Sequence, residues 1–328
     1  MPTILTVTIP FFALVLLGYV AAQRRVLPES AIAGLNAYVL YFALPCILFR
    51  FGASLPFAQL IDPWLVGVYA VCAVLVVALT VWLALAQGLD LKNAAFSALV
   101  GAFPNSGFMG VPLLVALFGE AAAGPVIGTL LVDLFLTSTL CLALAEAPGA
   151  QAPGASPGAA ALPTVIARSL RAAATNPLPW AIGLGALTAA LSLRLPAPVA
   201  QVVKMLAESA SPVALFTIGA VLWRAGQHAH TRTPLREYLP VALVKLLVHP
   251  LLVGGAGLAL RAAGFGVPTF GLTMLVLAAA LPSASNVSLL AERHGADDGR
   301  IARIIMASTV LAFASFSLLA AWLGRPAG

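Results

Sequence analysis

Ten long apolar segments constrain the fold of this chain more than any other feature. A helix that crosses a bilayer needs about 20 predominantly apolar residues, and these segments approach or exceed that length. Their apolar residues follow one another without strict alternation, which favours helices over the strands of a membrane barrel. We expect the helices at 3–22, 31–51, 63–87, 94–118, 125–145, 177–193, 199–223, 239–261, 269–291 and 299–323.

The composition excludes several classes of protein. Hydrophobic residues make up 61% of the 328 residues and charged residues only 9%, whereas soluble domains carry about 25% charged residues. A soluble enzyme, a nucleic-acid-binding protein and a disordered chain are therefore excluded. The sequence predicts an all-α integral membrane protein whose surroundings are the lipid bilayer.

The basic residues indicate a topology. Eleven of the 17 Lys and Arg residues fall near alternate loops, and the positive-inside rule places those loops in the cytoplasm. Ten helices then leave both termini outside. The first apolar run precedes Arg24 and Arg25, the opposite of the charge order in a cleaved signal peptide. The basic residues of the cytoplasmic set are Arg24, Arg25, Lys92, Arg168, Arg171, Arg224, Arg232, Arg236, Arg293, Arg300 and Arg303.

A linker and an internal repeat divide the chain. Residues 146–162 read EAPGAQAPGASPGAAAL, which is typical of a linker. We expect a first five-helix unit over 1–145, a cytoplasmic linker over 146–176 and a second five-helix unit over 177–328. ALPCILFRFGA (43–53) and ASPVALFTIGA (210–220) match at six of eleven positions, and chance similarity is the alternative. Five helices per unit place the second unit upside down, as in inverted-repeat transporters.

The fourth and ninth segments are interrupted at corresponding places. GAFPNSGFMGVPLL (101–114) and ALPSASNVSLL (280–290) both carry Pro followed by Asn and Ser. Proline removes a backbone donor, and glycine loosens the helix. Irregular backbone at membrane depth persists where protein buries it or where it lines a water-filled cavity, so two matched breaks indicate a binding site. Simple packing kinks are the alternative.

These breaks suit an anionic ligand. The N-terminal ends of the interrupted helices carry partial positive charge, and short polar side chains there can orient the ligand. The predicted substrate-binding residues are Pro104, Asn105, Ser106, Gly107, Gly110, Pro112, Pro282, Ser283, Ser285 and Asn286.

PNSGFMGVPLL, LPSASNVSLLAERHG and the five-plus-five layout resemble the auxin efflux carrier family. Its bacterial members are often labelled malonate or organic-acid transporters. The resemblance implies ten helices in two inverted repeats, as in bile-acid symporters, with the fourth and ninth crossing at mid-membrane and organic anions as cargo. Pro104 and Asn105 match the first crossing segment, and Pro282 matches the second. It also implies a multi-pass protein of a bacterial inner membrane.

Two features depart from relatives of this fold. The linker is shorter than the cytoplasmic loop of many plant members, so auxin-like acids are weaker candidates than malonate. The breaks hold no Glu or Gln of the kind that sodium-coupled relatives carry, and this absence disfavours sodium coupling. A sodium-coupled symporter of the same fold is the alternative to proton coupling.

Four ionisable residues inside apolar segments are candidates for coupling, because charge is costly in a membrane. Lys245 and His249 lie four residues apart and share a helix face. Lys245 either faces the binding site or extends its charged end to the membrane surface. His249 either relays protons or packs against neighbouring side chains. Asp133 is a proton carrier or a partner of Lys245, with capping as the alternative. Glu208 joins this set, although Lys204 four residues earlier also predicts a helical ion pair.

The sequence thus predicts a secondary active transporter of small organic anions that works by alternating access. A channel or a sensor is the main alternative class. We expect no enzyme activity and no catalytic residues, because no catalytic set is evident and no P-loop is present. We also expect no cofactor and no metal, since the three cysteines lie apart in apolar runs. A homodimer is expected by analogy with related carriers.

Overall fold

The computed structural model describes residues 2–55, 60–147, 164, 167–168, 171, 174–228 and 234–324. Within these residues the chain is helical, and its one β-bridge joins Pro104 to Ser283. The elements, with η for π- or 3-10-helical turns, are α1 (Pro2–Gln23), α2 (Glu29–Tyr38), η1 (Val39–Ala43), α3 (Leu44–Ser54), α5 (Pro63–Ala86), α6 (Leu91–Ala102), η2 (Ser106–Gly110), α7 (Val111–Phe118), η3 (Glu120–Ala122), α8 (Ala123–Val132), η4 (Asp133–Thr137), α9 (Ser138–Ala145), α11 (Pro177–Ala190), α12 (Ala197–His228), α13 (Leu235–Leu243), η5 (Val244–Val248), α14 (His249–Ala262), α15 (Thr269–Ala279), α16 (Val287–Arg293) and α17 (Asp298–Leu323).

Among the described residues, seven helical stretches are long and apolar enough to span a membrane, and three shorter apolar helices accompany them. The prediction of an all-helical membrane protein is therefore confirmed at this level, while ten crossings in two inverted repeats stay a prediction. The expected fourth segment is split into α6 and η2–α7, and the ninth into α15 and α16. Most of the expected linker, together with Arg232 and Arg325, lies outside the described residues.

Polar side chains fix where several helices begin. Asp62, Asp90, Asn176 and Asp297 each accept a hydrogen bond from a backbone N–H in the first turn of α5, α6, α11 and α17, respectively. Such caps satisfy donors that the helix itself leaves free. The loops therefore set the register in which each apolar segment enters the fold.

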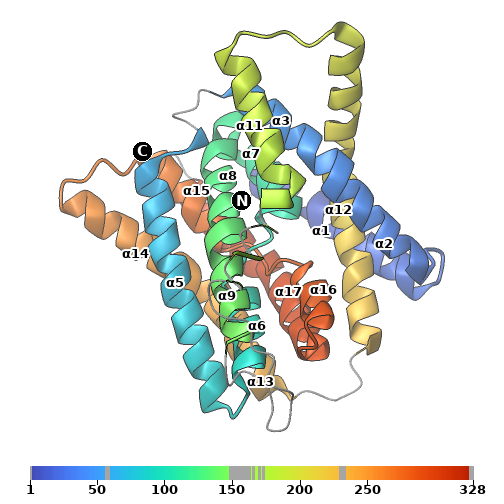
Figure 1. Cartoon of the computed structure of the whole chain (residues 1–328), viewed down its shortest axis with the longest axis vertical. Coiled ribbons are helices and arrows are strands. Elements are labelled where there is room, and N and C mark those ends of the chain that lie inside the picture. Colours follow the sequence, from blue (N-terminus) through green and yellow to red (C-terminus); the bar gives the residue numbers. More distant parts are fainter. Residues whose placement is uncertain are drawn as a thin grey trace.

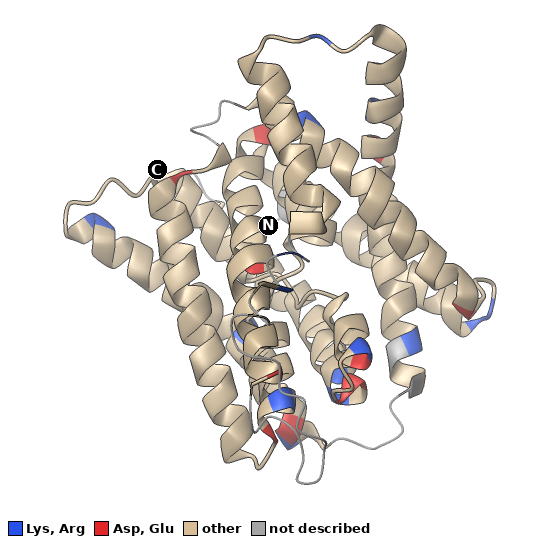
Figure 2. Ribbon diagram, in the orientation of Figure 1, with Lys and Arg blue, Asp and Glu red and all other residues tan. Residues whose placement is uncertain are grey.

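The helices form two bundles (Figure 1). The first bundle consists of α1, α2, α3, α11 and α12, in which α1 packs on α12 and α11 on α3. The second bundle holds the remaining helices, including both interrupted segments. The bundles meet where α12 and α1 contact α17 and where α12 contacts η2. Figure 2 shows the charged residues concentrated toward helix ends and loops, with long uncharged stretches between them.

Glycines allow the helices of the first bundle to pack backbone against backbone. A Cβ atom on Gly18 of α1 would lie 1.9 Å from the carbonyl oxygen of Phe216 in α12, and one on Gly219 would lie 1.8 Å from the carbonyl oxygen of Val15. Atoms cannot approach that closely. Glycine is therefore required at both positions of the α1–α12 contact.

The α3–α11 contact has the same construction. A Cβ atom on Gly185 would lie 2.2 Å from the carbonyl oxygen of Phe49, and one on Gly52 would meet the backbone of α11 at 2.5 Å. In the repeat noted above, Phe49 corresponds to Phe216 and Gly52 to Gly219. Equivalent residues of the two sequence repeats thus make equivalent contacts.

Candidate functional site

The two interrupted helices meet at a crossing formed by residues 103–106 and 280–286. The backbone N–H of Asn105 donates to the carbonyl oxygen of Pro282 at 2.8 Å, and that of Ala284 donates to Phe103 at 3.0 Å. These bonds satisfy groups that the helix breaks would otherwise leave buried without a partner. The predicted breaks are therefore present, and each supplies the hydrogen-bond partners of the other.

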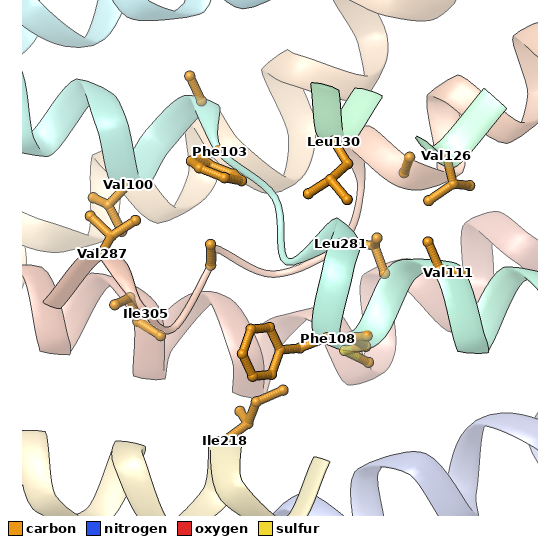
Figure 3. Close-up of a cluster of buried hydrophobic side chains, with 14 of the residues drawn as sticks. Val100, Phe103, Phe108, Val111, Val126, Leu130, Ile218, Leu281, Val287 and Ile305 are labelled. Carbon is orange, nitrogen blue, oxygen red and sulfur yellow. The ribbon is translucent and has the colours of Figure 1, made fainter. Parts of the chain in front are cut away.

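Apolar side chains enclose the crossing (Figure 3). They come from α6, η2, α8, α12 and α17 and include Phe108, which lies beside Ile218 of the first bundle. Gly110 permits the close approach of the two segments, because a Cβ atom there would lie 2.6 Å from Cδ1 of Leu281. The crossing is thus part of the packed core and lies next to the seam between the bundles.

The structure brings the predicted substrate-binding residues together, but their surroundings differ. Gly107, Gly110 and Pro112 lie buried in η2 and α7, where they shape the backbone. Asn286 is exposed at the start of α16. The remaining members, Pro104, Asn105, Ser106, Pro282, Ser283 and Ser285, are buried at the crossing.

One polar side chain at the crossing is buried without a hydrogen bond to the described residues, the hydroxyl of Ser283. The Asn105 side chain is only 3% exposed and makes no capping hydrogen bond to η2. Ser106 is instead paired, since Thr129 donates to its hydroxyl at 3.4 Å. Buried polar groups are usually satisfied. The Ser283 hydroxyl is therefore available to a ligand, and the Asn105 amide lies beside it at the crossing.

A buried carboxyl group lies in the same bundle. Asp133, at the start of η4, is fully buried and accepts hydrogen bonds from the Tyr69 hydroxyl and the Thr137 hydroxyl, both at 3.0 Å. Tyr69 comes from α5, so the carboxyl group joins two transmembrane elements. Two donors hold Asp133 in place within the apolar interior.

Lys245 and His249 complete this region, and we call Tyr69, Asp133, Lys245 and His249 the polar cluster. Lys245 donates to the carbonyl oxygen of Ala279 at 2.5 Å, where α15 ends beside the break. It attracts Asp133 electrostatically without a direct ion pair. The His249 ring lies 5.4 Å from the Tyr69 ring, and neither of its nitrogens has a partner among the described residues.

Glu208 does not join the polar cluster. It lies on α12 in the first bundle and pairs with Lys204 at 3.8 Å, with both side chains more than half exposed. This is the helical ion pair that the four-residue spacing also predicts. An exposed pair of this kind contributes little free energy.

Several residues were missing from the sequence-based set. Tyr69 resembles an ordinary member of an apolar helix, and nothing in its local sequence reveals that it contacts Asp133. Thr137 follows Asp133 by four residues, and that spacing could have indicated the contact. Arg300 resembles a topology-setting arginine, yet it is 1% exposed. Its guanidinium donates to the Glu237 carbonyl oxygen at 2.6 and 3.1 Å and to the Ser97 hydroxyl. It therefore ties α17 to α13 and α6.

The apolar helices and the paired breaks define a multi-pass helical membrane protein of the transporter class. Residues 3–320 match the family model described as membrane transport protein, Mem_trans. The chain belongs to this family, the auxin efflux carrier family. The resemblance noted in the sequence is thereby confirmed.

Relatives span much of the chain. A protein of Rhizobium meliloti (strain 1021) called "Putative malonate transporter" is 30% identical over 318 residues, covering 96% of this chain and 94% of the relative. The "Uncharacterized transporter YfdV" of Escherichia coli (strain K12) is 26% identical, covering 87% and 86%. "Auxin efflux carrier component 4" of Arabidopsis thaliana is 26% identical over 156 residues, which cover 45% of this chain and 24% of the plant protein.

Proposed function

We propose that this chain is a secondary active transporter of small organic anions, with carboxylates such as malonate as its substrates. The observation that carries the proposal is the crossing of two interrupted helices, where the Ser283 hydroxyl lacks a partner among the described residues and the buried Asn105 amide makes no capping hydrogen bond. An amide and a hydroxyl can both donate to a carboxylate. The helical stretch Ser106–Phe118 begins at the crossing and presents its positive end there. The name of the Rhizobium relative supports malonate over auxin-like acids.

Alternating access is the proposed mode of transport. The matched glycine contacts of α1–α12 and α3–α11 support two repeats of opposite orientation, which is the construction of many such carriers. The first bundle then serves as a frame and the second, which holds the crossing, moves against it. We place the protein in a bacterial inner membrane with both termini outside and as a homodimer, in keeping with the basic residues and with related carriers.

Proton coupling is assigned to the polar cluster. Asp133 is a buried carboxyl group with two donors, and Lys245 connects it electrostatically to the end of α15 at the crossing. Protonation of Asp133 would weaken its attraction for Lys245. That change would alter the hydrogen bond from Lys245 to the Ala279 carbonyl and so the end of α15 at the break. His249, whose two ring nitrogens have no partner among the described residues, is the proposed second proton-binding group of the cluster.

Uptake by purified protein in liposomes tests this function. Labelled malonate should enter saturably and should exchange with unlabelled malonate inside, because a carrier couples the two movements. Asn105→Ala should lower uptake at least tenfold, whereas Asn36→Ala on α2 of the first bundle should retain it. Uptake without exchange would favour a channel, and failure of every carboxylate tested would contradict the anion proposal.

The coupling ion is tested in the same liposomes. We expect an imposed proton gradient to accelerate uptake by the parent protein and sodium to have no effect. Asp133→Asn keeps the size of the side chain but removes its ionisable group. Uptake by this variant should proceed with little response to the gradient. A full response by Asp133→Asn would remove Asp133 from the mechanism, and a sodium requirement would support the symporter alternative.

A further inference from the structure

A deep apolar groove lies between α14, α15 and α17, away from the crossing. Its volume is about 920 Å³. Its walls are mainly aliphatic, with Leu251 and Leu258 of α14 and Leu318 of α17 strongly exposed. Because α14 and α17 belong to stretches long and apolar enough to span a membrane, we expect the groove to open toward the hydrocarbon of the bilayer. Lipid chains are its natural surroundings.

The two ends of the groove differ in chemistry. One end is formed by Arg261, Thr269 and Trp322, which lie at the end of α14, the start of α15 and the end of α17. The Arg261 side chain is exposed, and no salt bridge joins its guanidinium group to an acidic residue among those described. Tryptophan is enriched at the level of lipid headgroups. We therefore expect this end to lie at the bilayer surface, where it carries a positive charge.

The other end of the groove reaches the middle of the membrane. It is lined by Leu246 of η5 and Val276 of α15. Leu246 directly follows Lys245, and Val276 lies one turn before Ala279, so both lie beside the residues that form the lysine–carbonyl bond at the crossing. Along α14 and η5, the groove extends over about 20 Å, at 1.5 Å per residue. That length suits an acyl chain.

We propose that this groove is a binding site for a phospholipid of the bilayer leaflet on the Arg261 side. One acyl chain occupies the groove, and the headgroup phosphate contacts Arg261 with the hydroxyl of Thr269 beside it. The acyl chain gains packing contacts with the aliphatic walls, and the arginine adds a preference for anionic headgroups. A small carboxylate would gain little from the apolar walls, so a lipid suits the groove better than the transported substrate does.

A glycine in the groove offers a way to block it. A Cβ atom added at Gly255 would meet no heavy atom of the described residues within 4 Å beyond its own stretch of helix, so Gly255→Leu directs its side chain into open space. Gly183 of α11 is equally unobstructed but lies in the first bundle, which makes Gly183→Leu the matched control. Arg194, an exposed arginine between α11 and α12, is the matched control for Arg261.

The experiment measures lipid binding to detergent-purified protein by native mass spectrometry and by thermal stabilisation. Dioleoyl phosphatidylglycerol should bind the parent and raise its melting temperature, and phosphatidylcholine should do so more weakly. Gly255→Leu should lose one bound lipid and most of the stabilisation, and Arg261→Gln should weaken phosphatidylglycerol binding about tenfold. Gly183→Leu and Arg194→Gln should behave like the parent.

Three outcomes would overturn the site. Equal loss of lipid in Gly183→Leu would show that binding is not specific to the groove. Stabilisation by glycerol phosphate alone would show that a free phosphate is enough and that the groove plays no part. A change from dimer to monomer in Gly255→Leu would assign the groove to a second copy of the chain. Because no readout involves transport, the result is independent of the proposed substrate.

Discussion

The Lys245 ammonium group donates a hydrogen bond to the carbonyl oxygen of Ala279, the last residue of α15. A lysine is thereby placed at the negative end of a half-helix in the membrane interior. The same charge attracts Asp133. The end of α15, and with it the crossing, is thus held by a residue from a different helix.

The first prediction concerns this lysine. Lys245→Met should lower the free energy of unfolding by about 1.5–3 kcal/mol, because a charged hydrogen bond is lost. Combining it with Asp133→Asn should cost less than the two single changes together, with a coupling of about 0.5–3 kcal/mol. Thermal unfolding of the four proteins in detergent measures this cycle. Strict additivity would show that the two residues act independently.

The second prediction concerns the close approach of α3 and α11. Gly185→Ala should cost about 1–3 kcal/mol, because its Cβ atom would collide with the Phe49 backbone. Gly183→Ala, on the same helix with open space around it, should be neutral or stabilising by up to about 1 kcal/mol. Melting temperatures of the two variants provide the comparison. A similar loss in both would mean that the added methyl group destabilises α11 without acting through the Phe49 contact, because alanine has the higher helix propensity.

The third prediction concerns the buried arginine. Arg300→Lys should cost about 1–3 kcal/mol, since an ammonium group cannot reproduce the guanidinium contacts with the Glu237 carbonyl and Ser97. Arg293→Gln, at an exposed position of α16, should have little effect. Thermal melting again distinguishes them. Equal stability of Arg300→Lys and the parent would mean that the guanidinium contacts do not stabilise the fold and that Arg300 serves only to orient the helix in the membrane.

The fourth prediction concerns pH. Burial lowers the pKa of His294, in the loop after α16, below its usual 6.5, although nearby Glu146 opposes the shift. The unfolded chain then binds this proton more readily than the folded protein does. The contribution of His294 to stability is therefore present above about pH 6.5 and lost as the pH falls.

His294→Asn should accordingly lose less stability between pH 7 and pH 5 than the parent loses. Lys92, Arg168 and Arg293 also surround this ring, and all three stay charged across that range. Melting temperatures at several pH values measure the difference. A steeper decline in the variant would mean that the 3.6 Å contact between His294 and Glu146 dominates.

The sequence predicted the breaks of the crossing well because their cause is local. Proline at 104 and 282 removes a donor within its own helix, and the effect needs no knowledge of the partner. The pairing of the two breaks belongs to the tertiary structure. It could be predicted only from the matched positions of the breaks in the two halves and from the family resemblance.

Other features lay beyond sequence reasoning because their partners are backbone groups or ordinary side chains. Nothing near Lys245 reveals that it contacts a carbonyl oxygen on another helix, and Tyr69 resembles any aromatic residue of an apolar span. The burial of Arg300 was not predicted, for a related reason. An arginine beside a membrane helix favours the cytoplasmic side whether it is exposed or buried, so the pattern does not distinguish the two.

The crossing also has a consequence for biosynthesis. The backbone N–H of Asn105 donates to the carbonyl oxygen of Pro282. More than half of the chain that follows Asn105 is synthesised before Pro282 is added. Until then the first interrupted helix lies in the bilayer without the bonds that complete it. The first five segments are therefore expected to remain dependent on the translocation machinery or on chaperones, and to become resistant to proteolysis only when the ninth segment has been inserted.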